Sequence, residues 1–304
     1  MVMIKRVLAL LGSGALAILL LRQAETAAQA VRDGVQLCLT SVVPALFPFF
    51  AVSSLLVALG AAEAAGRVLA HPFRRLFRCG GAGCAALLLG LVGGYPVGAR
   101  TAAELVRRGE LSPAEGARLL TFCNNAGPAF AIGVAGVSVF GSARTGVWLY
   151  LLHCAAALLT GLLFCRRPLP VTAMPKRPVP PQTGLTGQFL RAVEGAVSAM
   201  ARVCGFVVFF LVLLRLTEGL IGPLPPLAAG VLELTNGILR LTPDRRGFVT
   251  AAALLGWGGL SVHCQTAAVT AGSGISLRLY LPAKAVQAAL SAGLAALLAP
   301  YLLP

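Results

Sequence analysis

Long apolar runs separated by short polar and basic loops dominate this chain. A helix needs about 20 apolar residues to cross the hydrocarbon core of a bilayer, so shorter runs are expected to belong to broken or re-entrant segments. Backbone N–H and C=O groups cannot stay unpaired in lipid, and the runs lack the alternation of barrel strands. The pattern therefore predicts an all-α polytopic membrane protein. The runs cover residues 7–21, 35–60, 81–99, 119–140, 145–165, 203–214, 248–260 and 285–303.

The composition and the placement of charge agree with this fold class. Of the 304 residues, 58% are hydrophobic and 12% are charged, whereas about 25% are charged in a typical soluble domain. The formal net charge of +15 would suggest nucleic-acid binding in a soluble protein. Here the basic residues lie in short loops between apolar runs, which is the positive-inside pattern. We expect a multi-pass protein of the cell membrane with the lipid bilayer as its partner, and no nucleic-acid binding.

The sequence carries no motif for nucleotide-driven transport or for hydrolysis. It contains neither the G-x-x-x-x-G-K-[ST] loop nor a Ser/His/Asp or H-E-x-x-H arrangement. The eight cysteines lie mostly inside apolar runs without zinc-ligand spacing, which predicts structural thiols. We therefore expect no enzyme activity, no metal and no cofactor, while a coupling ion, H⁺ or Na⁺, stays open.

A basic, proline-rich stretch at 166–191 divides the chain. Proline at this density opposes helix formation, and the basic residues place the stretch on the cytoplasmic side. We interpret it as a linker between a first transmembrane half, residues 1–165, and a second half, residues 192–304. With Lys5 and Arg6 also inside, ahead of an uncleaved first helix, the first half needs an even number of crossings. Helices at 4–22, 35–60, 119–140 and 145–165, with 81–99 re-entrant, satisfy this and place 67–78 and 100–118 inside.

The two halves contain related sequences. LLLGLVGGYPVGARTA (87–102) resembles LLGWGGLSVHCQTA (254–267), and long apolar runs precede and follow both copies. Internal repeats with Gly- or Pro-interrupted segments at matching places are typical of secondary transporters. We expect two related, inverted repeats with broken or re-entrant helices; a chance match in a chain rich in Gly, Ala and Leu is the alternative.

Helix-breaking or polar residues enter the apolar runs at four places, of which GLVGGYPVGART (90–101) is the first. Glycines and a proline cannot hold a regular helix without cost, and a broken helix frees backbone groups that bind polar ligands. Close helix packing is the alternative. The candidate binding residues are Gly94, Tyr95, Pro96, Gly98 and Arg100.

The second place is TFCNNAGPAF (121–130), where two amides interrupt an apolar run. Buried Asn is costly unless it is paired. Asn124, Asn125 and Gly127 are candidates for a substrate-lining kink, with interhelical contact as the alternative. Ser112-Pro113-Ala-Glu115 upstream predicts a helix start with a capping box.

The third place is LELTNG (232–237), with Glu233, Thr235 and Asn236. A carboxylate inside the membrane indicates a proton or cation site. A helix-end residue at the interface is equally consistent with the sequence, because Arg240 follows closely.

The fourth place is WGGLSVHCQTA (257–267). Gly259, Ser261, His263 and Gln265 do not share one helical face but would line an unwound segment. His263 is a candidate for following proton movement, although a single His is more often structural.

Five segments resemble the sporulation integral membrane protein YlbJ family, also called SpoVV, and the resemblance extends over roughly residues 30–300. It implies a nucleoside-recognition gate domain related in fold to concentrative nucleoside transporters. It also implies a role in endospore formation, with transport of dipicolinic acid across the outer forespore membrane. The segments are SVVPALFPFF (41–50), GYPVGART (94–101), LLTFCNNAGPAF (119–130), ELTNG (233–237) and GGLSVHCQ (258–265).

We therefore expect a transporter of a small anionic metabolite, dipicolinic acid. Dipicolinate is a dianion and would need hydrogen-bond donors, and positive half-helix ends suit its carboxylates. Two alternatives stay open. One is a transporter for a nucleoside or another small polar metabolite, whose site would tolerate Glu233 facing the ligand. The other is a non-transporting membrane scaffold. A homo-oligomer also remains open.

Overall fold

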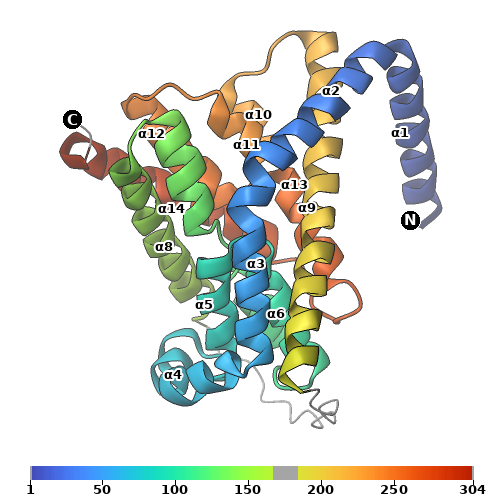
Figure 1. The fold of residues 1–304 in the computed structure, drawn as a ribbon. Coiled ribbons are helices and arrows are strands. Elements are labelled where there is room, and N and C mark those ends of the chain that lie inside the picture. The colour runs from blue at the N-terminus through green and yellow to red at the C-terminus, as the bar shows by residue number, and fades with distance from the viewer. Residues whose placement is uncertain (1, 167–183, 303–304) are drawn as a thin grey trace.

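The computed structural model describes residues 2–166 and 184–302, which are helical and contain no strand within these ranges (Figure 1). The predicted all-α class is thereby confirmed. Two stretches, η1 and η2, are π-helical. In chain order the elements are α1 (Val2–Arg22), α2 (Ala24–Leu37), η1 (Cys38–Val42), α3 (Val43–Ala58), α4 (Ala61–Phe77), α5 (Gly83–Gly93), α6 (Val97–Arg107), α7 (Pro113–Leu120), η2 (Ala129–Val139), α8 (Ala143–Phe164), α9 (Leu185–Ile221), α10 (Pro226–Leu232), α11 (Leu234–Leu239), α12 (Arg245–Trp257), α13 (Gly259–Thr270) and α14 (Tyr280–Leu302).

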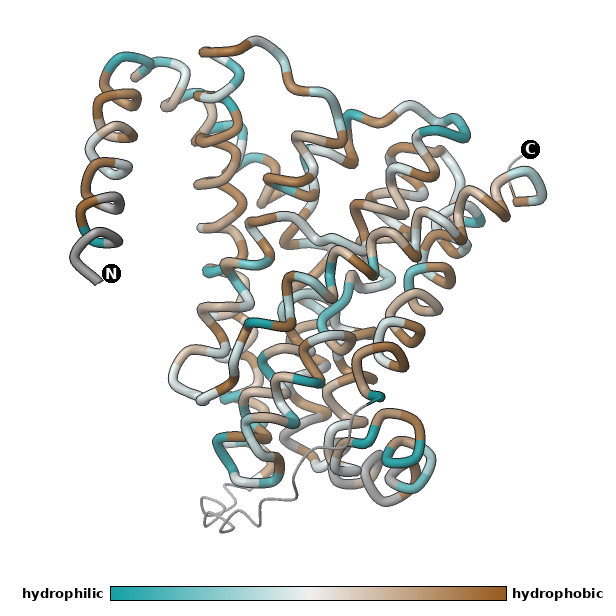
Figure 2. The backbone as a smooth tube through the Cα atoms, turned by 180° about the vertical axis from the view of Figure 1, so that it is seen from behind, coloured by the Kyte–Doolittle hydropathy of each residue, from teal (hydrophilic) through white to brown (hydrophobic). Residues whose placement is uncertain are grey.

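Four described segments are long and apolar enough to cross a bilayer, namely α8, α9, α14 and α12 continued by α13. A fifth candidate is the pair Ala24–Val42 and Leu46–Leu56, which bends by 59°. Large apolar side chains such as Leu151 and Phe209 stay exposed on these helices, and hydrophobic residues run along most of the tube in Figure 2. Such surfaces face lipid rather than water. The protein is a multi-pass integral membrane protein.

Helices α5 and α6 fold back on each other as a hairpin. In a straight helix Gly90 and Gly98 would be about 12 Å apart. Here a Cβ atom on Gly90 would lie 2.9 Å from the Cα of Gly98, so the two helices touch. The chain reverses at Gly94, whose φ of +76° favours glycine, and at the cis Tyr95–Pro96 peptide bond. The predicted break at 90–101 is therefore a turn with two antiparallel arms.

A second hairpin, α10–α11, was not expected from the sequence. Gly230 and Gly237 lie in direct contact, and the chain reverses at Glu233. Glu233 is extended there, with φ of −140° and ψ of 115°, and its carboxylate caps α11. Both hairpins depend on glycine at the crossing because a side chain would push the arms apart.

The predicted helix over 119–140 is wrong. Helix α7 begins at the capping box of Ser112 and Glu115, as expected, but ends at Leu120. Residues 121–128 are largely irregular, and η2 begins at Ala129. The two amides, Gly127 and Pro128 stop the helix because they compete for backbone groups or cannot continue it.

Other predicted boundaries also shift. The expected helix 35–60 begins earlier, at Ala24, and bends before Leu46. Helix α9 begins at Leu185, inside the range 166–191; residues 167–183 of the expected linker lie outside the described residues. The expected helices 4–22 and 145–165 match α1 and α8.

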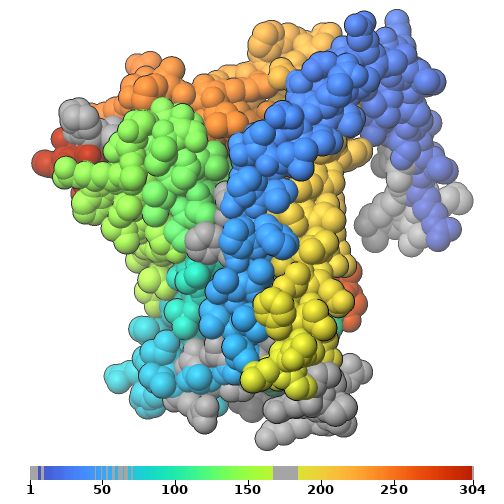
Figure 3. Space-filling model, viewed as in Figure 1, coloured from blue at the N-terminus to red at the C-terminus, as the bar shows by residue number. Residues whose placement is uncertain are grey.

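Basic segments gather at one end of the body. Arg78 donates to the carbonyl oxygen of Arg166 and accepts, through its own carbonyl, from Arg118 at 3.1 Å. Helix α9 starts at this end and runs to the opposite one, with α2 and α3 packed along it (Figures 1 and 3). This arrangement agrees with the prediction that residues 67–78, 100–118 and 166 lie on the same side of the membrane. An inverted relation between the halves stays a prediction.

We expect Gly98→Ala to lower the melting temperature of the detergent-purified protein by roughly 5 °C or more, because a Cβ atom would overlap the Cys123 carbonyl oxygen. Thermal unfolding followed by intrinsic fluorescence measures this. The matched control is Gly205→Ala in α9, which meets no atom within 4 Å and should leave stability unchanged or slightly raised. Equal melting temperatures for both variants would contradict the tight hairpin.

The basic end should face the cytoplasm. In a variant without the eight native cysteines, an impermeant maleimide added outside intact cells should label Pro223→Cys and leave Arg191→Cys unlabelled until the cells are opened. Both positions are exposed, at opposite ends of α9. The reverse labelling pattern would overturn the orientation.

Candidate functional site

The four places that the sequence indicated lie against one another, although the chain reversal at Glu233 was not among the expected breaks. A Cβ atom on Gly94 would lie 2.9 Å from the Gly127 nitrogen, which joins the first break to the second. One on Gly258 would lie 3.0 Å from the Tyr95 hydroxyl, and one on Gly259 would lie 3.0 Å from the Leu234 nitrogen. The hairpin tips, the irregular segment 121–128 and the break at Gly258 between α12 and α13 therefore meet inside the body. The expected unwound segment at 257–267 is wrong, because Ser261, His263 and Gln265 lie on the regular helix α13.

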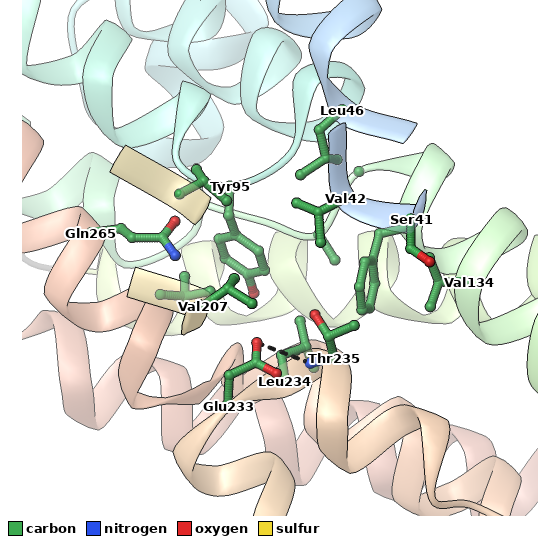
Figure 4. Close-up of a pocket in the computed structure, with 15 residues that line it drawn as sticks. Ser41, Val42, Leu46, Tyr95, Val134, Val207, Glu233, Leu234, Thr235 and Gln265 are labelled. Atoms are coloured by element: carbon green, nitrogen blue, oxygen red, sulfur yellow. Dashed lines mark hydrogen bonds between the residues drawn. The ribbon is translucent and has the colours of Figure 1, made fainter. Parts of the chain in front are cut away.

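A cavity lies at this meeting point (Figure 4). It leaves about 50 Å³ for the centres of water-sized molecules, whereas sites for small organic ligands usually measure about 300–1,000 Å³. The cavity is therefore smaller than a typical site for a small organic ligand. The lining residues are Ser41, Val42, Leu46, Tyr95, Ala126, Gly127, Phe130, Val134, Val203, Val207, Glu233, Leu234, Thr235, Val262 and Gln265.

Glu233 is the acidic group of the cavity wall and is only 2% exposed. Its Oε1 accepts from the Thr235 N–H at 3.2 Å, and its Oε2 accepts from the Asn236 N–H at 2.8 Å and from the Asn236 amide at 2.7 Å. Arg240, which suggested an interfacial alternative, instead pairs with Glu218. The carboxylate is therefore held by its own hairpin tip.

Asn124 and Asn125 point behind the cavity wall. Asn124 Nδ2 donates to Thr266 Oγ1 at 2.8 Å and to the Tyr280 hydroxyl at 3.2 Å. Asn125 Nδ2 donates to the Phe122 carbonyl at 2.7 Å, and its Oδ1 accepts from Gln287 Nε2 at 2.9 Å. Both amides thus tie the second break to α13 and α14.

The remaining predicted residues fall into three groups: some line the cavity, some shape or brace the breaks, and one lies at the surface. Gln265 lines the cavity and donates to Ser261 Oγ at 3.3 Å. His263 Nδ1 lies 3.1 Å from the Tyr280 hydroxyl, beside the cavity rather than on its wall. Pro96, Gly98 and Gly259 shape the breaks. Arg100 lies off the cavity and donates to the Gly195 carbonyl at 3.2 Å.

Lys284 is a central residue that the sequence analysis missed. Its side chain is 0% exposed, and Nζ donates to the Asn124 carbonyl and, at 2.8 Å, to Gln287 Oε1. The Tyr95 ring lies beneath it, with its centroid 5.3 Å from Nζ. A lysine within an apolar helix was the available signal, since intramembrane charges are functional by default.

Two helical hairpins and two broken helices meet around a mainly apolar cavity that carries a few polar side chains, Glu233 and Gln265 among them. This arrangement defines a transporter-like membrane protein. Residues 39–143 match the Gate family, described as nucleoside recognition. The chain is 28% identical, over an alignment of 310 residues, to the sporulation integral membrane protein YlbJ of Bacillus subtilis (strain 168). The alignment covers 85% of this chain and 74% of that protein. No solved structure matches. The resemblance noted in the sequence is confirmed.

The Gate match holds the first hairpin and the Asn break, both from the first half of the chain. Glu233, Gln265 and Lys284 lie outside it. The candidate site therefore combines residues inside the Gate match with residues that follow it in the chain.

The bond between Asn125 and Gln287 should be energetically coupled. Asn125→Ala and Gln287→Leu should each destabilise the protein by about 1–3 kcal/mol, because each leaves a buried partner unpaired. Together they should cost less than the sum of the two, with a coupling of about 1 kcal/mol in a double-mutant cycle of detergent-phase unfolding. Pairing Asn125→Ala with a substitution at the exposed Gln29 is the control and should be additive. Additivity in the first cycle would contradict the contact.

Proposed function

We propose that this protein is a secondary transporter that moves a small polar metabolite through the cavity between the hairpin tips. The observation that carries the proposal is the convergence of four helix breaks on one cavity. Irregular backbone at membrane depth is tolerated only where it is buried in protein or lines a water-filled path. Four such breaks gathered at one place are costly for a purely structural scaffold, and they match the binding sites of transporters with discontinuous helices.

We further propose that the substrate is dipicolinate, moved across the outer forespore membrane during spore formation. The name of the Bacillus subtilis relative supports a sporulation role. Helices α6 and α13 both begin at a break without a side-chain cap, so the positive ends of their dipoles would favour carboxylate oxygens there, although the Val97 N–H of α6 already donates to the Gly94 carbonyl at 2.8 Å. Lys284 adds a positive charge behind Tyr95, a cavity-wall residue.

A nucleoside is the second candidate, and Glu233 is the observation that favours it. A carboxylate on the cavity wall repels a dianion but accepts hydrogen bonds from ribose hydroxyls or base N–H groups. The description of the Gate family as nucleoside recognition points the same way. Glu233 accepts hydrogen bonds from three N–H groups. These bonds weaken the repulsion between its carboxylate and a dianion without removing it.

The test is uptake of labelled dipicolinate and of labelled uridine into proteoliposomes. Wild-type protein should take up dipicolinate, and Glu233→Gln should speed this uptake about tenfold, because one like charge is removed at short range. Glu25→Gln, on the exposed surface of α2, is the matched control and should change nothing.

Uridine uptake that Glu233→Gln abolishes would replace dipicolinate by the nucleoside candidate. Uptake of neither solute, by protein with an unchanged unfolding profile, would overturn both candidates for this protein.

A further inference from the structure

The two hydrogen-bond acceptors of the Lys284 ammonium and the ring beside it each present the negative end of a dipole. They are a backbone carbonyl from the second break, the amide oxygen of Gln287 and the face of the Tyr95 ring. Among the described residues, no ion pair joins Lys284 to a carboxylate. An ammonium without a carboxylate partner is costly in a dry interior, and the two acceptors and the ring face reduce that cost.

These surroundings are those of a cation site. Hard cations such as Na⁺ take oxygen ligands, and in transporters with discontinuous helices the carbonyls of unwound segments provide them. The Asn124 carbonyl belongs to such a segment, since residues 121–128 are largely irregular. Here the cation that binds the Asn124 carbonyl is the Lys284 ammonium of α14, rather than an ion from solution.

The position of this charge links it to the cavity. Tyr95 separates the two, because Lys284 Nζ lies over its ring while the Tyr95 side chain also lines the cavity. The Tyr95 hydroxyl donates to the Leu255 carbonyl at 2.9 Å, which ties the first hairpin tip to the end of α12. The ammonium therefore stabilises both the irregular backbone of the second break and the part of the cavity wall that Tyr95 forms.

We infer that the Lys284 ammonium is a tethered cation that occupies the place of a free coupling ion. It is a positioning residue: it holds the irregular backbone around Asn124 and the Tyr95 ring in the substrate-competent arrangement. The consequence for transport rests on the proposed function: substrate should be transported without Na⁺. Removal of the ammonium opens a site for a small soluble cation.

The first experiment needs no substrate. Wild-type protein in detergent should melt at the same temperature in sodium chloride and in choline chloride. Lys284→Ala should melt lower, and methylammonium chloride should restore about half or more of the loss, because a cation that binds only the folded state stabilises it. Lys284→Met fills the space without charge and should not respond. Arg278→Ala, an exposed cation ahead of α14, is the control and should behave as wild type.

The second experiment is uptake in proteoliposomes with sodium replaced by choline. The wild-type rate should not change, whereas Lys284→Ala should lose about tenfold in rate and regain part of it with methylammonium. Sodium-dependent uptake by the wild type would overturn the tethered cation while leaving the transport function intact. Failure of uptake for both solutes would overturn the transport function, and the melting experiment would still decide on the cation.

A melting temperature of the wild type that rises with sodium would overturn the inference. So would a Lys284→Ala protein that no small cation stabilises. If the alanine variant does not fold, the sodium independence of the wild type in both experiments remains the deciding measurement.

Discussion

Backbone groups freed by a helix break at membrane depth must find partners inside the protein, and this requirement organises the molecule. The Ala126 N–H donates to His153 Nε2 at 3.1 Å, and the Phe122 carbonyl accepts from Asn125. The Asn124 carbonyl accepts from Lys284, and the Leu255 carbonyl from Tyr95. Each bond joins a break to another element or closes it locally, because lipid offers no alternative partner. The breaks therefore gather at one place, and the cavity follows from that gathering.

Glycine makes this gathering compatible with close packing. Gly90 and Gly98 let the arms of the first hairpin touch and leave room for the Cys123 carbonyl between them. Gly230 and Gly237 do the same in the second hairpin. Tyr95 at the first tip and Leu234 at the second also belong to the buried apolar core that residues of η2, α8, α12 and α14 form.

Two charged residues lie at the cavity, Glu233 on its wall and Lys284 behind the wall. Glu233 lies on the cavity wall and is satisfied by donors of its own hairpin, whereas Lys284 lies behind the wall among oxygen acceptors. The two groups come from different elements and are held by different partners. A solute in the cavity would meet the carboxylate directly and the ammonium through the Tyr95 ring, so the charge of the preferred solute depends on which of the two fields is stronger. This balance separates the anionic substrate from the nucleoside.

The sequence by itself determined the membrane-helical class, the start of α7, and three of the four places where helices break, because these depend on local composition and on Gly, Pro and Asn at particular positions. It also pointed to Glu233, since a carboxylate in an apolar run is conspicuous. Only the tertiary structure decided that α10 and α11 fold back, that Asn124 and Asn125 turn away from the cavity, and that Lys284 joins the second break. Those outcomes depend on contacts between residues as far apart as Asn124 and Lys284, which packing creates and no local pattern encodes.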